Sequence, residues 1–279
     1  MNAAKPLDNF PLVRSRDIEE VREAIARIYA KPALVPAPGV KALDATINNC
    51  RLQDIDLTYG AFGAAIEIEF PATGFFCQLF PIRGKGDVII GSTPTTLTAG
   101  GIAVVPADAE VSGKYSDDYE YLVLRINARK LTEKLAALTG AAIQEPLRIE
   151  PQQNWRHPAS QILQQYVPLL IDTLSDANPP FPEWWIAQTE QLLMTLFLCG
   201  HCHNYSHLLE QDVPDAAARQ VRQAEEFIVA NAERAISLEE LAEVTGVSAF
   251  SLFSAFKKHR GYSPMEFVAQ RRTRQGKIR

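Results

Sequence analysis

The chain has 279 residues, more than the ~250 at which a single hydrophobic core usually stops growing, so we expect two or more domains. Its composition, 47% hydrophobic and 22% charged, excludes an intrinsically disordered chain. The sequence has no uncharged apolar stretch near the ~18 residues of a membrane span, and its charged N-terminus is unlike a signal peptide. Four scattered cysteines favour reduced thiols, so we expect a cytoplasmic protein without a membrane partner.

Charge is distributed unevenly along the chain. From Arg219 to Arg279, Lys and Arg outnumber Asp and Glu by 11 to 7, whereas residues 1–218 hold 17 basic against 26 acidic residues. The basic end is suited to approach phosphate groups. An acidic domain joined to a mildly basic one would give the same gradient, so motifs must decide between them.

Residues 1–45 are predicted to form an N-terminal helical leader. Ile18, Val21, Ile25 and Ile28 recur at steps of three and four residues, which is typical of an amphipathic helix that ends before Pro32.

Residues 46–130 are predicted to form a small β-barrel or sandwich. Short runs rich in β-branched and aromatic residues alternate with glycine-containing turns, and no long helical pattern joins them as a parallel doubly wound sheet would need. The clearest predicted strands are Ala64 to Phe70, Phe75 to Pro81, Asp87 to Ile90, Gly101 to Val105 and Tyr119 to Ile126.

Residues 131–209 are predicted to be helical. Leucines at positions 131, 135 and 138 precede Gly140, a second apolar stripe extends from Ile162 to Leu174, and a third helix, from Trp184 to Leu198, is apolar on most faces. Such helices either pack on the barrel or form a subunit interface. We favour the interface, and therefore a homodimer. The polar stretch at residues 210–217 is predicted to be a linker.

Residues 218–279 have the pattern of a helix-turn-helix. Ser237 with Glu240 forms a capping box that begins one helix, Gly246 suits the tight turn, and Ser248 can cap the next helix. Ser263 with Pro264 begins a further helix. A plain three-helix bundle is the alternative, but the spacing of these signals favours a unit that places its second helix in the major groove.

The predicted DNA-contacting residues lie on that second helix. Phe250 and Phe253 are suited to contact thymine methyl groups, whereas the basic residues at the helix end are suited to phosphates. The set is Ser248, Phe250, Ser251, Phe253, Ser254, Lys257, Lys258 and Arg260.

The chain resembles the AraC/XylS family of bacterial regulators. The segments Ile236 to Ala242, Gly246 to Ser248 and Phe256 to Met265 are similar to the first of that family's two helix-turn-helix units, and Tyr121 to Ile126 and His203 to Leu209 resemble the sensor half of its XylS-like branch. The resemblance implies an α+β protein: a cupin-like barrel sensor, a helical dimerisation region and an all-α DNA-binding domain.

The same resemblance implies a function and partners. We expect a ligand-responsive transcription regulator, an activator, whose partners are promoter DNA, RNA polymerase, a small-molecule effector and a second copy. The family's second helix-turn-helix is not found before Arg279, so we expect a truncated DNA-binding half. The alternative is a truncated protein that acts mainly by forming dimers, without independent sequence-specific DNA binding.

Effectors of XylS-like regulators are often organic or aromatic acids, so arginines near the barrel are candidate ligand-binding residues. They are Arg51, Arg83 and Arg125, with Cys77 and Gln78 as weaker candidates on an apolar strand. For each arginine, a structural or surface role is the alternative.

Enzymatic and metal-binding roles are not expected. The sequence has no histidine before His157, so the barrel cannot hold a histidine-ligated metal. The dense group Cys199, His201, Cys202, His203 and His207 suggests zinc, but its spacing matches no standard zinc finger. We expect no metal, no cofactor and no catalytic constellation.

Overall fold

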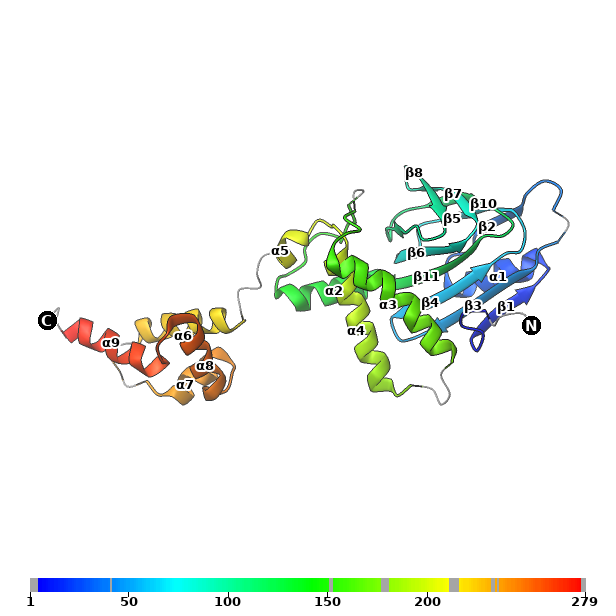
Figure 1. Cartoon of the computed structure of the whole chain (residues 1–279). Coiled ribbons are helices and arrows are strands. Elements are labelled where there is room, and N and C mark those ends of the chain that lie inside the picture. Colours follow the sequence, from blue (N-terminus) through cyan, green and yellow to red (C-terminus); the bar gives the residue numbers. More distant parts are fainter. Residues whose placement is uncertain are drawn as a thin grey trace. The chain divides into compact units, whose positions relative to one another are not determined.

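The computed structural model describes residues 5–40, 42–150, 153–176, 181–210, 216–231, 234 and 236–276 (Figure 1). They divide into two compact units, Met1–Ser206 and His207–Arg279. The first unit combines antiparallel sheets with helices and the second is helical, which confirms the predicted α+β class. In the described part of the chain, no helix has the length and apolarity needed to cross a membrane.

Two antiparallel sheets form the centre of the first unit. The six-stranded sheet has the order β1 (Pro11–Ser15), β3 (Ala45–Arg51), β4 (Ile55–Ala61), β11 (Glu120–Asn127), β6 (Phe75–Arg83), β9 (Ala103–Val105). The five-stranded sheet has the order β2 (Ala33–Pro36), β5 (Ile66–Phe70), β10 (Val111–Tyr115), β7 (Lys85–Ile90), β8 (Thr93–Thr98). Each of the five strands singled out in the sequence is present, with ends shifted by up to two residues.

The sheets face each other and enclose a common interior. Cys77 and Leu79 of β6 and Val111 and Tyr115 of β10 line one cavity, although they belong to different sheets. Side chains alternate between the two faces of a strand. Phe76 and Gln78 of β6 are accordingly available to the outer face of the six-stranded sheet.

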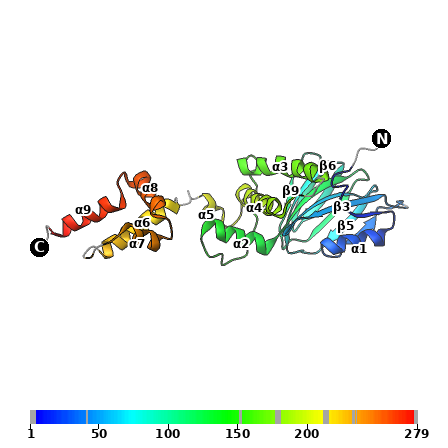
Figure 2. The same cartoon turned by 90° about the horizontal axis from the view of Figure 1, so that it is seen from below.

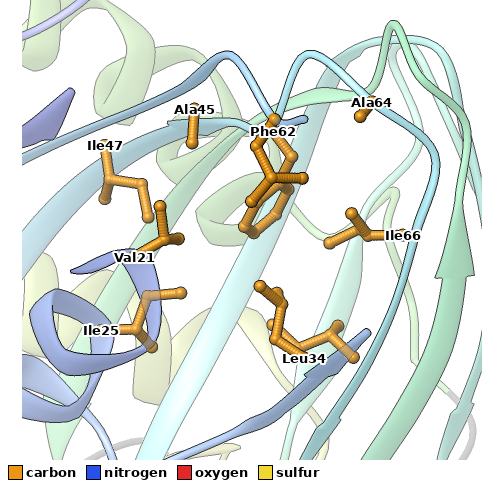
Figure 3. Packing of buried hydrophobic residues seen from close by; sticks show 10 residues of the cluster. Val21, Ile25, Leu34, Ala45, Ile47, Phe62, Ala64 and Ile66 are labelled. Atoms are coloured by element: carbon orange, nitrogen blue, oxygen red, sulfur yellow. The ribbon is translucent and has the colours of Figure 1, made fainter. Parts of the chain in front are cut away.

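Residues before position 46 are part of this barrel, so the prediction of a separate helical leader was wrong. Strand β1 pairs with β3, and β2 pairs with β5. Helix α1 (Ile18–Ile28) buries Val21 and Ile25 against Ile47 and Phe62 (Figure 3). Both missed strands are short and lie at sheet edges, where few residues carry the β pattern and proline is tolerated.

A helical layer packs against the outer face of the six-stranded sheet. It contains α2 (Ala128–Thr139), α3 (Pro158–Ser175) and α4 (Glu183–Gly200), and the short helix α5 (Ser206–Glu210) follows (Figures 1 and 2). The ring centroids of Phe76 on β6 and Phe197 on α4 are 6.0 Å apart. Gln78 is fully buried, and neither of its amide atoms has a hydrogen-bond partner among the described residues.

Glu190 connects this layer to the barrel. Its carboxylate accepts three backbone N–H bonds from the β3–β4 turn, from Gln53 at 2.8 Å, Asp54 at 2.7 Å and Ile55 at 2.9 Å. Burial raises the pKa of Glu190, while the three donors oppose that shift. One buried side chain of α4 therefore determines where the turn lies.

The second unit contains α6 (Ala216–Ala230), α7 (Leu238–Thr245), α8 (Ala249–Arg260) and α9 (Pro264–Gly276) around Leu252 and Phe256. The predicted caps are confirmed: Ser237 Oγ accepts from Glu240 N, and Ser248 Oγ accepts from Ser251 N, both at 3.1 Å. Gly246 and Gly261 adopt left-handed conformations at the helix ends. Within the predicted linker, residues 211–215 lie outside the described residues.

Removal of the Glu190 carboxylate should destabilise the first unit. Glu190→Ala leaves the N–H groups of Gln53, Asp54 and buried Ile55 without this acceptor, and we expect the free energy of unfolding in urea to fall by about 3 kcal/mol. Gln188→Ala, at an exposed position on the same helix, is the control and should change it by less than about 0.5 kcal/mol. Equal effects of the two substitutions would contradict the anchoring role.

Candidate functional site

The interior of the barrel contains a partly open cavity of about 90 Å³. Its walls are mostly apolar, with four tyrosines, one threonine and one cysteine as the polar contributors. The lining residues are Tyr29, Phe62, Ile68, Phe70, Pro71, Thr73, Cys77, Leu79, Val105, Ala109, Val111, Tyr115, Tyr119, Tyr121 and Val123. None of these residues is charged. Apolar walls with a few polar groups are typical of small-molecule sites.

Two of the tyrosines lie over glycines of the neighbouring strand. Tyr121 of β11 is opposite Gly60 of β4, and Tyr115 of β10 is opposite Gly86 of β7. A Cβ at residue 60 would lie 2.4 Å from the Tyr121 ring, and one at residue 86 would lie 2.7 Å from the Tyr115 ring. The glycines therefore make room for these rings in the barrel wall.

The aromatic side chains also contact each other. Ring centroids are 4.8 Å apart for Tyr115 and Tyr119, and 5.5 Å apart for Tyr119 and Tyr121. Phe62 stacks on Tyr121 at 6.2 Å. These contacts fix the rings in one continuous wall.

The polar groups of the cavity are neutral hydrogen-bond donors. Burial raises the pKa of Tyr29, Tyr115, Tyr119 and Tyr121 well above the usual value of a phenol, and it raises the pKa of Cys77 to about 12. Among the described residues, the hydroxyls of Tyr115, Tyr119 and Tyr121 have no hydrogen-bond partner. These three hydroxyls are therefore available to a bound molecule.

Arg125 lies on the same face of β11 as Tyr121 and Val123 but outside the cavity lining. Its guanidinium carbon is 5.0 Å from the ring centroid of Tyr29 and 4.1 Å from that of Phe75. The guanidinium forms an ion pair with buried Asp56 and donates to the carbonyl oxygen of Ile28. Arg125 thus holds α1 on the barrel, and the Tyr29 ring is part of the boundary between it and the cavity.

The structure separates the other predicted ligand residues. Arg51 is exposed at the end of β3 and, with Arg125, lines an open groove beside the end of α1 and the β3–β4 turn. Arg83 is exposed on β6, 3.5 Å from an Asp118 carboxylate oxygen. Cys77 lines the cavity, whereas Gln78 is buried outside it.

Sequence reasoning missed the tyrosines. Tyr119, Tyr121 and Val123 alternate with the buried Leu122 and Leu124 along one strand, and this two-residue period was the available signal. It indicated which residues share a face, but only the pairing of the strands could show which face is enclosed.

The Cys and His group near residue 200 is built into the helical layer. His201 is buried, with its Nδ1 2.8 Å from the carbonyl oxygen of Phe197, and Nε2 of buried His203 is 3.0 Å from that of Leu198. His207 is exposed on α5. Within the described residues, no three His, Cys, Asp or Glu side chains are placed to hold a metal ion.

Helix α8 has a buried face and an exposed face that carries two aromatic side chains. Leu252, Ala255 and Phe256 are buried, whereas Phe250 is 80% and Phe253 41% exposed. The remaining predicted contact residues, Ser248, Ser251, Ser254, Lys257 and Lys258, are also exposed.

Lys257 and Arg260 of α8 make ion pairs within the unit. Lys257 Nζ is 3.3 Å from a Glu266 carboxylate oxygen. Arg260 makes a two-point ion pair with Glu225 of α6, at 2.8 and 2.9 Å, and this lowers the pKa of Glu225. Arg260 therefore has a structural role that the sequence did not indicate.

Comparison with known proteins gives one family match. A model of the AraC-binding-like domain matches residues 21–198. A 47-residue segment is 45% identical to the XylDLEGF operon transcriptional activator 2 of Pseudomonas putida; the match spans 17% of this chain and 30% of the length of that protein.

The solved structures that match this chain are distant in sequence. The AraC-like transcriptional activator CuxR is 12% identical, covering 95% of this chain and 94% of that one, with a TM-score of 0.48. The cupin domain of Schizosaccharomyces pombe Cnp3 is 14% identical, covering 35% and 70% respectively, with a TM-score of 0.28.

A side chain at residue 86 should collide with the Tyr115 ring. Because a Cβ there lies 2.7 Å from the Tyr115 ring, Gly86→Ala should displace the ring and cost about 1–3 kcal/mol in urea unfolding. Adding Tyr115→Ala removes the clash, so the two substitutions should be non-additive by at least ~1 kcal/mol in a double-mutant cycle. Additive effects would show that the ring does not depend on Gly86.

His201 should make stability depend on pH. Burial lowers its pKa to about 4, below the ~6.5 of an unfolded chain, so between these values the unfolded state binds more protons. As pH falls from 7 to 4, the His201 contribution should reduce the unfolding free energy by about 3 kcal/mol. His201→Gln should flatten this dependence in urea titrations, whereas His207→Gln, at an exposed position, should not. An unchanged pH profile for His201→Gln would contradict its neutral burial.

Proposed function

The chain belongs to the family defined by the AraC-binding-like domain, whose model matches more than half of it, and we propose that it is a ligand-responsive, DNA-binding transcription activator. The observation that carries the proposal is the exposed face of α8. A helix capped at both ends and fixed by a buried Phe256 exposes 80% of Phe250, and such an exposed aromatic residue on a rigid helix suits a binding surface.

The proposed contacts fall into two groups. Lys257 and Lys258, at the end of α8, bind the phosphates of the DNA backbone through their positive charge. These contacts contribute to the affinity for DNA but do not distinguish one base sequence from another. Phe250 and Phe253 contact thymine methyl groups in the major groove, and the exposed serines approach base edges or phosphates. Arg260, held by Glu225, contributes mainly by fixing α8 on α6.

The cavity is the proposed effector site. An effector alters transcription only if it binds one arrangement of the protein more tightly than another. The connection from Tyr29 through Arg125 and Asp56 to the turn that Glu190 holds gives the cavity a physical link to α4.

The helical layer is the proposed homodimer interface. Its exposed apolar side chains are Ile162 and Leu169 on α3 and Trp184 and Leu192 on α4. Large apolar groups on two adjacent helices suit a self-complementary contact. Cytoplasmic location and contact with RNA polymerase complete the proposal.

Fluorescence anisotropy tests sequence-specific DNA binding. The affinity is measured for the DNA upstream of the gene and for a scrambled duplex, at a series of salt concentrations. We expect tighter binding to the upstream DNA at moderate salt, lost in Phe250→Ala. Lys257→Ala should weaken binding to both duplexes and reduce the salt slope by about one, whereas Lys114→Ala, on the barrel surface, should not. Equal, steeply salt-dependent binding to both duplexes by the unaltered chain would instead favour a protein that acts mainly by forming dimers.

A further inference from the structure

We infer that the cavity binds an uncharged aromatic molecule with a hydrogen-bond acceptor, in preference to an aromatic carboxylate. The inference rests on the proposed sensing function and names the class of effector. It departs from the organic acid expected from the family resemblance, and the reasons lie in the charges, donors and size of the cavity.

The first reason is the absence of a positive charge in the wall. No Lys, Arg or His is among the lining residues that the structure describes. An ion moved from water into such a site loses its hydration, and this cost is offset only by a partner of opposite charge in good geometry. Phenol hydroxyls replace part of the lost hydration but bring no such charge.

The second reason is that the nearest guanidinium already has a counter-ion. Arg125 is 95% buried, and its two terminal nitrogens are bound to Asp56 and to the Ile28 carbonyl, while its Nε has no hydrogen-bond partner among the described residues. The Tyr29 and Phe75 rings flank the guanidinium. A carboxylate that reached Arg125 would meet the negative charge of Asp56. The ion pair is neutral as a whole, so it does not attract an acid.

The third reason is the kind of hydrogen bonding that the wall offers. The hydroxyls of Tyr115, Tyr119 and Tyr121 stay protonated and have no partner in the described part of the chain, so each can donate to a carbonyl, ether or similar oxygen. The surrounding rings favour an aromatic body through stacked or edge contacts.

Size restricts the ligand further. The cavity of about 90 Å³ is smaller than the ~150 Å³ engineered cavity that binds benzene, so a one-ring ligand needs a modest movement of the wall. Tyr29 and Thr73 line both the cavity and the groove that holds Arg125, so movement of the Tyr29 ring would open a path between them. The inference therefore concerns single-ring molecules.

Isothermal titration of the full chain with three probes of one ring tests the inference: toluene, acetophenone and benzoate, at pH 7. The first has no acceptor, the second a neutral acceptor and the third a charge. We expect acetophenone to bind at least tenfold more tightly than benzoate and severalfold more tightly than toluene. Binding of benzoate as tightly as acetophenone, or of neither, would overturn the inference.

Single-hydroxyl variants locate the binding site. Tyr119→Phe and Tyr121→Phe remove a donor and keep the ring, so at least one should weaken acetophenone binding by about tenfold without changing toluene binding. Tyr166→Phe on α3, outside the cavity, is the matched control and should change neither. Loss of affinity for acetophenone and toluene alike would indicate a change of shape rather than a lost hydrogen bond, and would count against the donor role.

The anisotropy assay separates this inference from the proposed function. Selective acetophenone binding by a chain that does not discriminate between DNA duplexes would support the inferred ligand class and contradict the proposed function in transcription. Sequence-specific DNA binding by a chain that prefers benzoate would support the proposed function and contradict the inferred ligand class.

Discussion

The buried charge of Arg125 is the constraint on which the sensor unit depends. A guanidinium removed from water needs partners, and those of Arg125 come from three separate elements: Asp56 on β4, the carbonyl of Ile28 at the end of α1, and the Phe75 ring on β6. The hydrogen bond to Ile28 brings α1 onto the barrel. The position of α1 in turn sets Tyr29, which closes one side of the cavity.

A single side chain also connects the barrel to the helical layer. Glu190 uses one carboxylate to hold a whole turn, and that turn leads directly into β4, which carries Asp56. A change at the cavity wall thus has a short route of hydrogen bonds and an ion pair to α4. Whether a ligand uses that route depends on its differential affinity for two arrangements, not on proximity alone.

Local signals explain which parts of the fold could be read from the sequence. The helix caps at Ser237, Ser248 and Ser263 follow from chemistry between residues three apart, so they were predictable and are present. The edge strands β1 and β2 depend on partners far along the chain, and the prediction missed them. The candidate ligand arginines lie outside the cavity lining for a related reason: burial and the partner of Arg125 are properties of strand pairing, which a single sequence does not reveal.

The N-terminal segment has a consequence for synthesis on the ribosome. The Leu7 N–H donates to Ser175 Oγ at the end of α3, and Asn48 donates to the Pro6 carbonyl. The N-terminal residues are synthesised first, but their contact with Ser175 can form only after more than 150 further residues have been made. The β3–β4 turn likewise lacks its acceptor until Glu190 has been made. These contacts of the first unit therefore cannot form until α3 and α4 have been made, so the unit reaches its final packing late in synthesis.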